Sequence, residues 1–253
     1  MAESFGYDAA RYDRARPSYP GEMVDRIFAL SPGADVLDVG CGTGIVSRQF
    51  RAVGCRVLGV DVDERMALFA RSAGLEVEVS TLEAWDPAGR RFDAVVCGQA
   101  WHWVQPVAGA AKAASVLRPQ GRLAVFWNVA QPPAEVAREL SAVYRRVLPG
   151  SPFADGVLPG IAGYSEIFTR ATDGMLAVSA LGEPERWLFD WQREYTRDEW
   201  LDRVPTFSGH SALRGDQLEE LLHGTAAAID ALGGGFTMSY TTAVITARHE
   251  RPT

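Results

Sequence analysis

Three glycines at alternate positions, Gly40, Gly42 and Gly44, directly follow a short apolar run that begins at Val36. Asp38 stands within that run, two residues before the first glycine. The apolar residues favour a buried strand, the glycines allow a tight turn, and the residues after them indicate the start of a helix. A strand, a glycine turn and a helix in this order bring backbone close to a bound ligand. The sequence therefore predicts a ligand site at this turn.

Two kinds of cofactor fit a glycine turn after a first strand. The dinucleotide fingerprint Gly-x-Gly-x-x-Gly would need a glycine where this chain has Ile45. A carboxylate at Asp38 would repel a pyrophosphate, whereas it would pair favourably with the ammonium and sulfonium groups of S-adenosylmethionine. The turn therefore favours S-adenosylmethionine over NAD(P).

Further candidate site residues follow the next two strand-like runs. Asp61 ends the second run, where a carboxylate can accept hydrogen bonds from both ribose hydroxyls of an adenosine. Leu82 and Glu83 lie in the loop after the third run, beside Trp85, and an apolar side chain there could cover an adenine face. Together these residues predict an adenosine site next to the glycine turn.

Strand-like and helix-like segments alternate through the first half of the chain. We expect strands over 35–39, 56–60, 75–79, 92–97 and 122–127, and helices over 22–30, 43–53, 63–72 and 105–117. Such alternation indicates a parallel sheet with helices on both faces, and right-handed crossovers place the carboxyl ends of all strands at one edge. The predicted fold class is α/β: a Rossmann-like, doubly wound, seven-stranded sheet, mostly parallel, with an antiparallel last strand.

The regular alternation of strand-like and helix-like segments ends after Asn128. A helix is expected over 133–148, a Gly- and Pro-rich loop over 149–163, strands over 185–196 and 236–247, and helices over 198–204 and 215–232. We expect a single domain over 1–253, with a lead-in over 1–30 and a cofactor-binding core over 31–130. The segments 149–184 and 197–232 are predicted to be insertions that form a helical substrate cap, and 185–196 and 236–247 to be closing strands.

Composition narrows the classes of partner. The net charge of −7 argues against a nucleic-acid partner, and the three cysteines lack the paired spacing of a disulfide framework or a zinc site. No cluster of carboxylates with histidine stands out, so no metal is expected. No apolar run is long enough to span a membrane, and the first residues do not resemble a signal peptide. We expect a cytoplasmic monomer or homodimer with no membrane partner.

Several motifs together resemble the class I S-adenosylmethionine-dependent methyltransferases that act on small molecules. They are the Val36–Gly44 segment, Gly59-Val60-Asp61, Leu82-Glu83, Phe92-Asp93 and Gln99-Ala100-Trp101-His102-Trp103. The lead-in from Tyr12 to Pro20 is similar to one branch of that family, which carries Tyr-Asp-x-x-Arg-Pro-x-Tyr-Pro, and so are Thr206-Phe207-Ser208 and the segment from Tyr240 to Ala243. The resemblance runs nearly end to end, but 149–184 matches no family motif.

The resemblance implies S-adenosylmethionine as cofactor, S-adenosylhomocysteine as product and a small molecule as methyl acceptor. It also implies a role for each matched residue. The methionine part of the cofactor would lie against Asp38, Gly40, Cys41, Gly42, Gly44, Gln99 and Ala100. The ribose would be bound by Asp61, the adenine would lie beside Val62, Leu82 and Glu83, and Tyr12 and Arg16 would cover the cofactor, with Arg16 near its carboxylate.

His102 has two interpretations. It could be a general base, since histidine titrates near neutral pH, or it could shape the wall of the site. Three functions also stay open: methyl transfer to an O, N, S or C nucleophile, S-adenosylmethionine binding without transfer, and NAD(P)-dependent oxidoreduction. Ile45 counts against the last of these.

Overall fold

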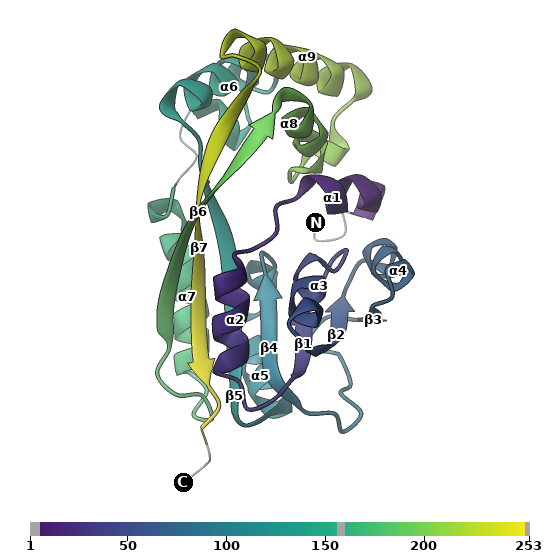
Figure 1. The fold of residues 1–253 in the computed structure, drawn as a ribbon, viewed down its shortest axis with the longest axis vertical. Helices are drawn as coiled ribbons and strands as arrows, with labels where there is room; N and C mark the ends of the chain where they lie inside the picture. The colour runs from purple at the N-terminus through teal and green to yellow at the C-terminus, as the bar shows by residue number, and fades with distance from the viewer. Residues whose placement is uncertain (1–5, 156–159, 251–253) are drawn as a thin grey trace.

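One seven-stranded sheet organises the protein, whose computed structural model describes residues 6–155 and 160–250. Residues 1–5 of the predicted lead-in and 156–159 of the predicted cap lie outside the described residues. The strand order is β3-β2-β1-β4-β5-β7-β6 (Figure 1). The strands are β1 (Asp35–Val39), β2 (Arg56–Asp61), β3 (Glu76–Val79), β4 (Phe92–Gly98), β5 (Leu117–Gln131), β6 (Glu185–Thr196) and β7 (Gly235–Arg248). Strands β1 to β5 run parallel to one another and β7 is antiparallel to both β5 and β6, which confirms the predicted fold class.

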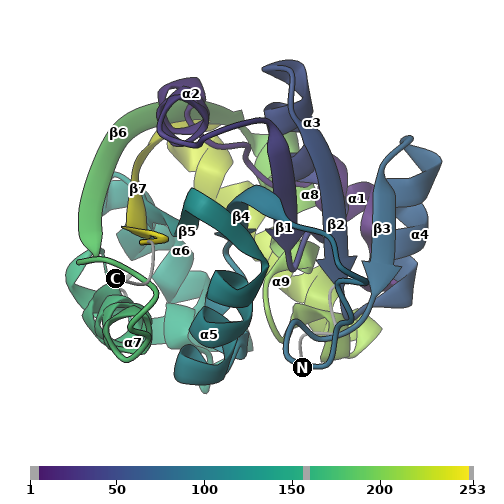
Figure 2. The ribbon, with the colours of Figure 1, turned by 90° about the horizontal axis from the view of Figure 1, so that it is seen from below.

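Helices cover both faces of the sheet. They are α1 (Ala9–Ala15), α2 (Gly21–Ala29), α3 (Ile45–Ala52), α4 (Glu64–Ser72), α5 (Pro106–Val116), α6 (Ala134–Val147), α7 (Ser165–Leu176), α8 (Arg197–Arg203) and α9 (Gly215–Ala231). Helices α2 and α3 lie on one face, and α5 and α7 on the other (Figure 2). Successive residues of β1 therefore enter different cores, with Val36 packing beside α2 and α3 and Leu37 in the cluster that includes α5 and α7.

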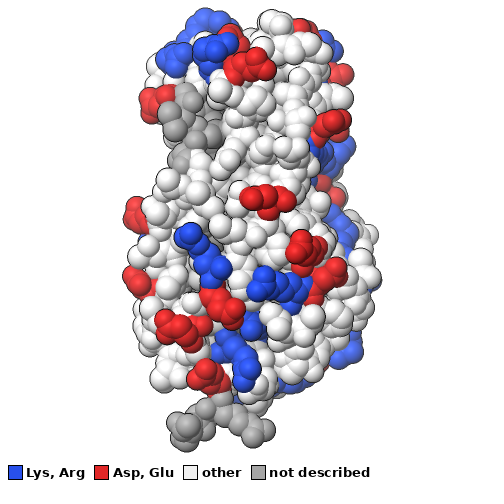
Figure 3. Space-filling view, turned by 60° about the vertical axis from the view of Figure 1, so that its left-hand side comes forward, with Lys and Arg blue, Asp and Glu red and all other residues white. Residues whose placement is uncertain are grey.

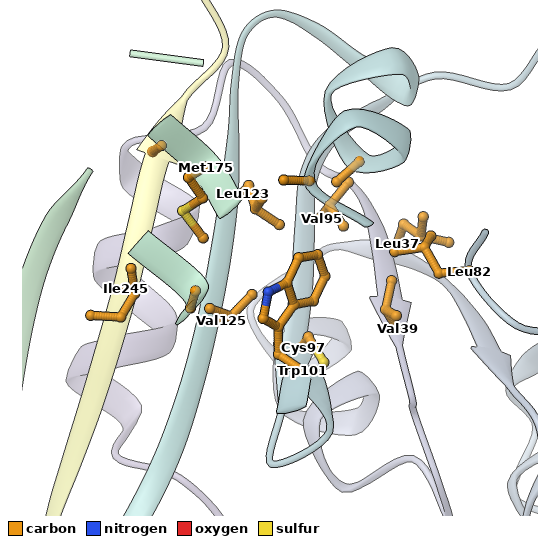
Figure 4. Packing of buried hydrophobic residues seen from close by; sticks show 14 of the residues in the cluster. Leu37, Val39, Leu82, Val95, Cys97, Trp101, Leu123, Val125, Met175 and Ile245 are labelled. Carbon is orange, nitrogen blue, oxygen red and sulfur yellow. The ribbon is translucent and has the colours of Figure 1, made fainter. Parts of the chain in front are cut away.

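The core on the α5 and α7 side contains the side chain of Trp101. Figure 4 shows its indole between residues of β4 and β5, close to Val95 and Val125. Only 3% of this residue is exposed. Trp101 is therefore a packing residue that fixes the turn after β4, and it leaves its neighbours in sequence to face outward.

Helix α7 departs from the predicted organisation. It lies within 149–184, for which we predicted a cap, yet its Phe168, Ala171 and Met175 pack in the sheet core and its backbone lies against α5. A Cβ on Gly174 would come within 2.5 Å of the Pro106 carbonyl oxygen, so the two helices touch at this glycine. The prediction of a cap over the whole of 149–184 is therefore wrong for this helix.

The cap consists of α6, α8 and α9, which lie beyond the carboxyl edge of the first strands (Figure 1). Helices α8 and α9 fall within 197–232, the other segment predicted as cap, whereas α6 lies outside both segments. Strands β5, β6 and β7 have 15, 12 and 14 residues, against 4 to 7 residues in β1 to β4, so they reach past the edge and support these helices. The cap has its own core around Tyr195 and Leu221. No helix in the described part of the chain is both long and apolar enough to cross a membrane.

Candidate functional site

A cavity of about 960 Å³ opens at the carboxyl ends of the parallel strands and continues beneath the cap. Ligand sites in open α/β sheets form at this edge because the loops after the strands converge there. The floor of the cavity contains strand-end residues: Val39, Gly40 and Gly42, Val60, Asp61 and Val62, Gly98, Gln99 and Ala100, and Asn128 and Ala130. Its cap side contains Leu140, Ser141, Tyr144, Phe153, Tyr164, Trp200, Arg203, Phe207 and Met238.

The glycine turn needs its three glycines for different reasons. All three have positive φ, at 65° for Gly40, 54° for Gly42 and 88° for Gly44. A Cβ on Gly40 would lie 2.5 Å from the Ala100 Cβ, and one on Gly44 would lie 2.0 Å from Leu75 Cδ1. A Cβ on Gly42 would meet no atom within 4 Å. The outer glycines therefore permit close packing, and Gly42 keeps its part of the cavity open.

Asp61 joins the end of β2 to the glycine turn. Its Oδ2 accepts the amide hydrogen of Gly42 at 2.7 Å, and its Oδ1 accepts that of Asp63 at 2.8 Å. Burial raises the pKa of Asp61, and the hydrogen bonds from the backbone amides oppose that shift. A carboxylate can accept about four hydrogen bonds, so this side chain retains capacity for hydroxyl groups of a ligand in the cavity.

Asp38 lies behind the cavity wall and not on its surface. Its Oδ2 accepts a hydrogen bond from Ser47 Oγ at 2.6 Å, while its Oδ1 is buried and has no partner in the described part of the chain. Burial raises the pKa of Asp38 to about 7. A buried carboxylate without full compensation is costly, and a cation bound nearby would stabilise its charged form. The predicted residues Cys41 and Gly44 also do not line the cavity.

The turn after β4 supplies another wall. Gln99 has φ 60°, an unfavourable conformation for a residue with a side chain, and such strain is concentrated at functional sites. Its amide donates to the Phe126 carbonyl at 2.8 Å, and its Nε2 donates to that of Asn128 at 3.3 Å. Both bonds aim the backbone of Gln99 and Ala100 at the cavity, which both residues line.

His102 and Trp103 stand at the cavity edge in the short helical turn Trp101–Trp103. Their ring centroids are 4.8 Å apart, and 46% of Trp103 is exposed. The Nδ1 atom of His102 is buried and has no partner among the described residues. Burial, together with the charge of Arg170, lowers the pKa of His102, so its ring is neutral at pH 7 and able to accept a proton.

The far end of the cavity is formed by the residues predicted for an adenine. Val62 and Leu82 give it an apolar lining, and Leu82 is buried. Glu83 lines the same end, where its Oε1 accepts the amide hydrogen of Gln105 at 2.9 Å. The loops after β2 and β3 therefore converge here, as the sequence predicts, with the loop after β4 tied to them.

Helix α1 closes the cavity from the side and brings Tyr12 and Arg16 to it. Arg48 fixes the helix to the glycine turn, since it donates to Asp13 Oδ1 at 2.6 Å and to the Thr43 carbonyl at 2.8 Å. Arg14 pairs with Asp202 of α8 at 2.8 Å. The lead-in thus connects the sheet edge to the cap and lies between them in Figure 1.

Several cavity residues were not predicted from the sequence. They come from the cap: Tyr144 on α6, Arg203 on α8, and Phe153 and Phe207 in the connecting turns. The sequence around Phe207 resembles one branch of the methyltransferases, but an arginine in a short charged helix resembles any surface arginine. Within the described ranges, no three His, Cys, Asp or Glu side chains gather as metal ligands would.

The chain is similar in sequence to known methyltransferases over part of its length. Residues 36–121 match the family described as "Methyltransferase domain". A Mycobacterium tuberculosis protein named as an uncharacterized methyltransferase is 36% identical over 159 residues, covering 62% of this chain and 64% of that protein. A ubiquinone biosynthesis O-methyltransferase from Bordetella parapertussis is 35% identical over 103 residues, 37% of this chain and 42% of that enzyme. These alignments span less than two thirds of the length of either relative.

A solved structure extends the likeness in fold to nearly the whole chain. It is described as a candidate type II methyltransferase from Anaeromyxobacter dehalogenans, with a TM-score of 0.61, 20% identity, and coverage of 94% of this chain and 99% of that one. The family match covers β1 to β4, and so includes the glycine turn, Asp61 and the turn after β4. Residues 36–121 thus match a methyltransferase domain, and nearly the whole chain has the fold of a solved structure described as a methyltransferase.

Proposed function

We propose that this protein transfers the methyl group of S-adenosylmethionine to a nucleophilic atom of a small molecule. The observation that carries the proposal is the contact between Asp61 and the amide of Gly42 at the cavity floor. This contact sets a carboxylate suited to ribose hydroxyls beside a glycine turn whose middle residue leaves space for a ligand. The family match over the same residues supports this assignment.

The residues at the cavity suit the parts of this cofactor. Gly40, Gly42, Gln99 and Ala100 would hold the methionine part, Asp61 the ribose, and Val62, Leu82 and Glu83 the adenine. The buried, unpartnered Oδ1 of Asp38 lies behind the turn, where the positive charges of the ligand would favour its ionised form. Arg16 has a buried Nε without a partner in the described part of the chain, which suits a carboxylate such as that of the methionine part.

When bound, the cofactor supplies a methyl group already activated by a positively charged sulfur. The protein then has to align the acceptor with that methyl group and exclude water, which are effects of positioning. Helix α1 and the cap would provide the exclusion because they close over the cavity. If the acceptor must lose a proton, His102 is the candidate base, since its ring is neutral and lines the cavity.

Two observations favour a small acceptor. The cavity volume of about 960 Å³ is at the upper end of the range for small-molecule sites, which leaves room for an acceptor beside the cofactor. On the face shown in Figure 3, acidic and basic side chains are interspersed and do not form the extended basic patch typical of nucleic-acid binding.

Turnover tests the proposal. The protein would be incubated with S-adenosylmethionine and a panel of small metabolites, and formation of S-adenosylhomocysteine would be measured. Acceptor-dependent product formation is expected, and His102→Gln should reduce kcat more than it changes KM if the residue acts as a base. Tight binding of S-adenosylmethionine without turnover on a broad panel would favour a binding function instead.

A further inference from the structure

Two guanidinium groups face the same cavity and have no acidic partner. Arg16 comes from the segment after α1, and Arg203 ends α8. The guanidinium carbon of each lies 5.5 Å from the centre of the Phe207 ring, so the two groups meet around one side chain. Neither forms an ion pair with a carboxylate in the described parts of the chain, whereas Arg14, Arg48 and Arg118 each do. Two like charges at one cavity, of which Arg203 is buried and Arg16 is partly buried, favour anionic ligands.

Arg203 is enclosed by aromatic residues of the cap. Only 6% of it is exposed, and its Nη1 donates to the hydroxyls of Tyr195, at 2.5 Å, and of Tyr240. Its guanidinium carbon lies between 5.1 and 5.7 Å from the centres of four aromatic rings. Its Nε is buried and without a partner in the described residues. The surroundings hold the cation in place and leave donor capacity unused.

The neighbouring phenols do not neutralise this charge. Burial raises the pKa of Tyr195, so its hydroxyl stays protonated at neutral pH. Tyr195 and Tyr240 also share a hydrogen bond of 2.8 Å between their hydroxyls. Attraction to aromatic faces offsets only part of the cost of burying a cation. Arg203 therefore remains a positive charge that lines the cavity.

The two arginines belong to different halves of the cavity. Arg16 follows the helix that Arg48 ties to the glycine turn, so it stands on the cofactor side. Arg203 lies in the cap, on the side that also contains Tyr144, Phe153 and Trp200. The single carboxylate of S-adenosylmethionine would meet Arg16, which stands on the cofactor side. Arg203, on the cap side, is then left to bind an anion of a second ligand.

We propose that Arg203 binds an anionic group of the methyl acceptor, which is a small molecule with a carboxylate or phosphate on a largely apolar body. This inference rests on the proposed function, because it takes the second ligand of the cavity to be the acceptor. The aromatic residues around Arg203 would contact the apolar body, and the guanidinium would bind the anion through charge-assisted hydrogen bonds.

A pair of fluorescent probes tests the charge preference directly. 8-Anilinonaphthalene-1-sulfonate and N-phenyl-1-naphthylamine share an aromatic body and differ in the anionic group. Wild-type protein, with and without saturating S-adenosylhomocysteine, should prefer the sulfonate. Arg203→Met should weaken sulfonate binding by roughly 10- to 100-fold and leave the neutral probe unchanged, as expected for a lost charge-assisted contact. Equal binding of both probes by wild type, or an unchanged preference in Arg203→Met, would overturn the proposal.

Arg193→Met is the matched control. Arg193 also contacts the Tyr195 ring, at 4.6 Å, but it does not line the cavity and its Nη2 lies 3.9 Å from Glu199 Oε1. This variant should keep the sulfonate preference. Should Arg203→Met fail to fold, Arg203→Lys replaces it, because lysine retains the charge without the planar fork. Arg203→Lys is expected to keep a reduced preference for the sulfonate over the neutral probe. A preference equal to that of the wild type would overturn the proposal.

Competition identifies the anion. Phenylacetate or phenyl phosphate should displace the sulfonate probe from wild type, and whichever displaces it at lower concentration indicates a carboxylate or a phosphate. Displacement by neutral phenylacetamide at the same concentration, or by none of the three, would contradict an anion site.

Cofactor binding separates this inference from the proposed function. Arg203→Met should bind S-adenosylhomocysteine like wild type. If it instead loses that affinity but binds 5′-methylthioadenosine normally, Arg203 serves the cofactor carboxylate and the inference is wrong. If wild type itself does not bind S-adenosylhomocysteine, the proposed function fails, whereas the probe preference still tests Arg203 in the ligand-free protein.

Discussion

Asp61 is the residue whose replacement should most affect cofactor binding without removing the fold. Asp61→Asn keeps the size of the side chain and one carbonyl oxygen, so one of the bonds from Gly42 and Asp63 can persist. It removes the negative charge and replaces one acceptor with a donor. Alanine would be a poorer choice, because it would leave both backbone amides without their acceptor.

The size of the effect follows from the bonds lost. A hydrogen bond to a charged group contributes about 1.5–3 kcal/mol, which corresponds to roughly a 10- to 150-fold weaker Kd for S-adenosylhomocysteine. Isothermal titration calorimetry measures it, with thermal unfolding as the check on folding. Asp63→Asn is the control: Asp63 caps α4 by accepting the Arg65 amide hydrogen at 3.0 Å and does not line the cavity. A folded Asp61→Asn protein with the wild-type Kd would refute the assignment of the ribose to Asp61.

Three further changes have defined outcomes. Because folding raises the pKa of Asp38 from 3.8 to about 7, wild type should lose stability as pH rises through that window, on the order of 4 kcal/mol, and urea unfolding of Asp38→Asn should lack this loss. Gly42→Leu should abolish cofactor binding by filling the cavity, while Gly42→Ala keeps part of it; at φ 54° both should be about 1–2 kcal/mol less stable in the same unfolding assay. Asp202→Asn removes the charge that pairs with Arg11 and Arg14 and should speed S-adenosylhomocysteine release a few-fold in stopped-flow measurements, because two ion pairs between α1 and the cap are then lost.

Local sequence predicted which strand-end residues meet at the floor of the cavity. Gly40, Gly42 and Asp61 come at the ends of short apolar runs. Because the carboxyl ends of parallel strands all lie at the same edge of the sheet, these residues are expected to lie close together. Asp38 shows the limit of this reasoning. Its position near the end of β1 follows from the sequence, but its contact with Ser47 in the next helix depends on how that helix turns back on the strand.

The division between cap and sheet core could not be predicted in the same way because it is defined by distant contacts. Phe168 and Met175 have the spacing of any amphipathic helix, and only the contact of α7 with α5 places them in the sheet core. Arg203 and Arg197 both lie in α8, yet one is buried among aromatic rings and the other pairs with Asp230 at the surface. Sequence alone gives both arginines the same solvated interpretation.

The central claim is that the cavity binds S-adenosylmethionine, and calorimetry of the unmodified protein tests it most directly. S-adenosylhomocysteine and NAD would be titrated separately into the same preparation. We expect S-adenosylhomocysteine to bind at one site per chain and NAD to give no saturable heat. Saturable NAD binding without any binding of S-adenosylhomocysteine would contradict the account.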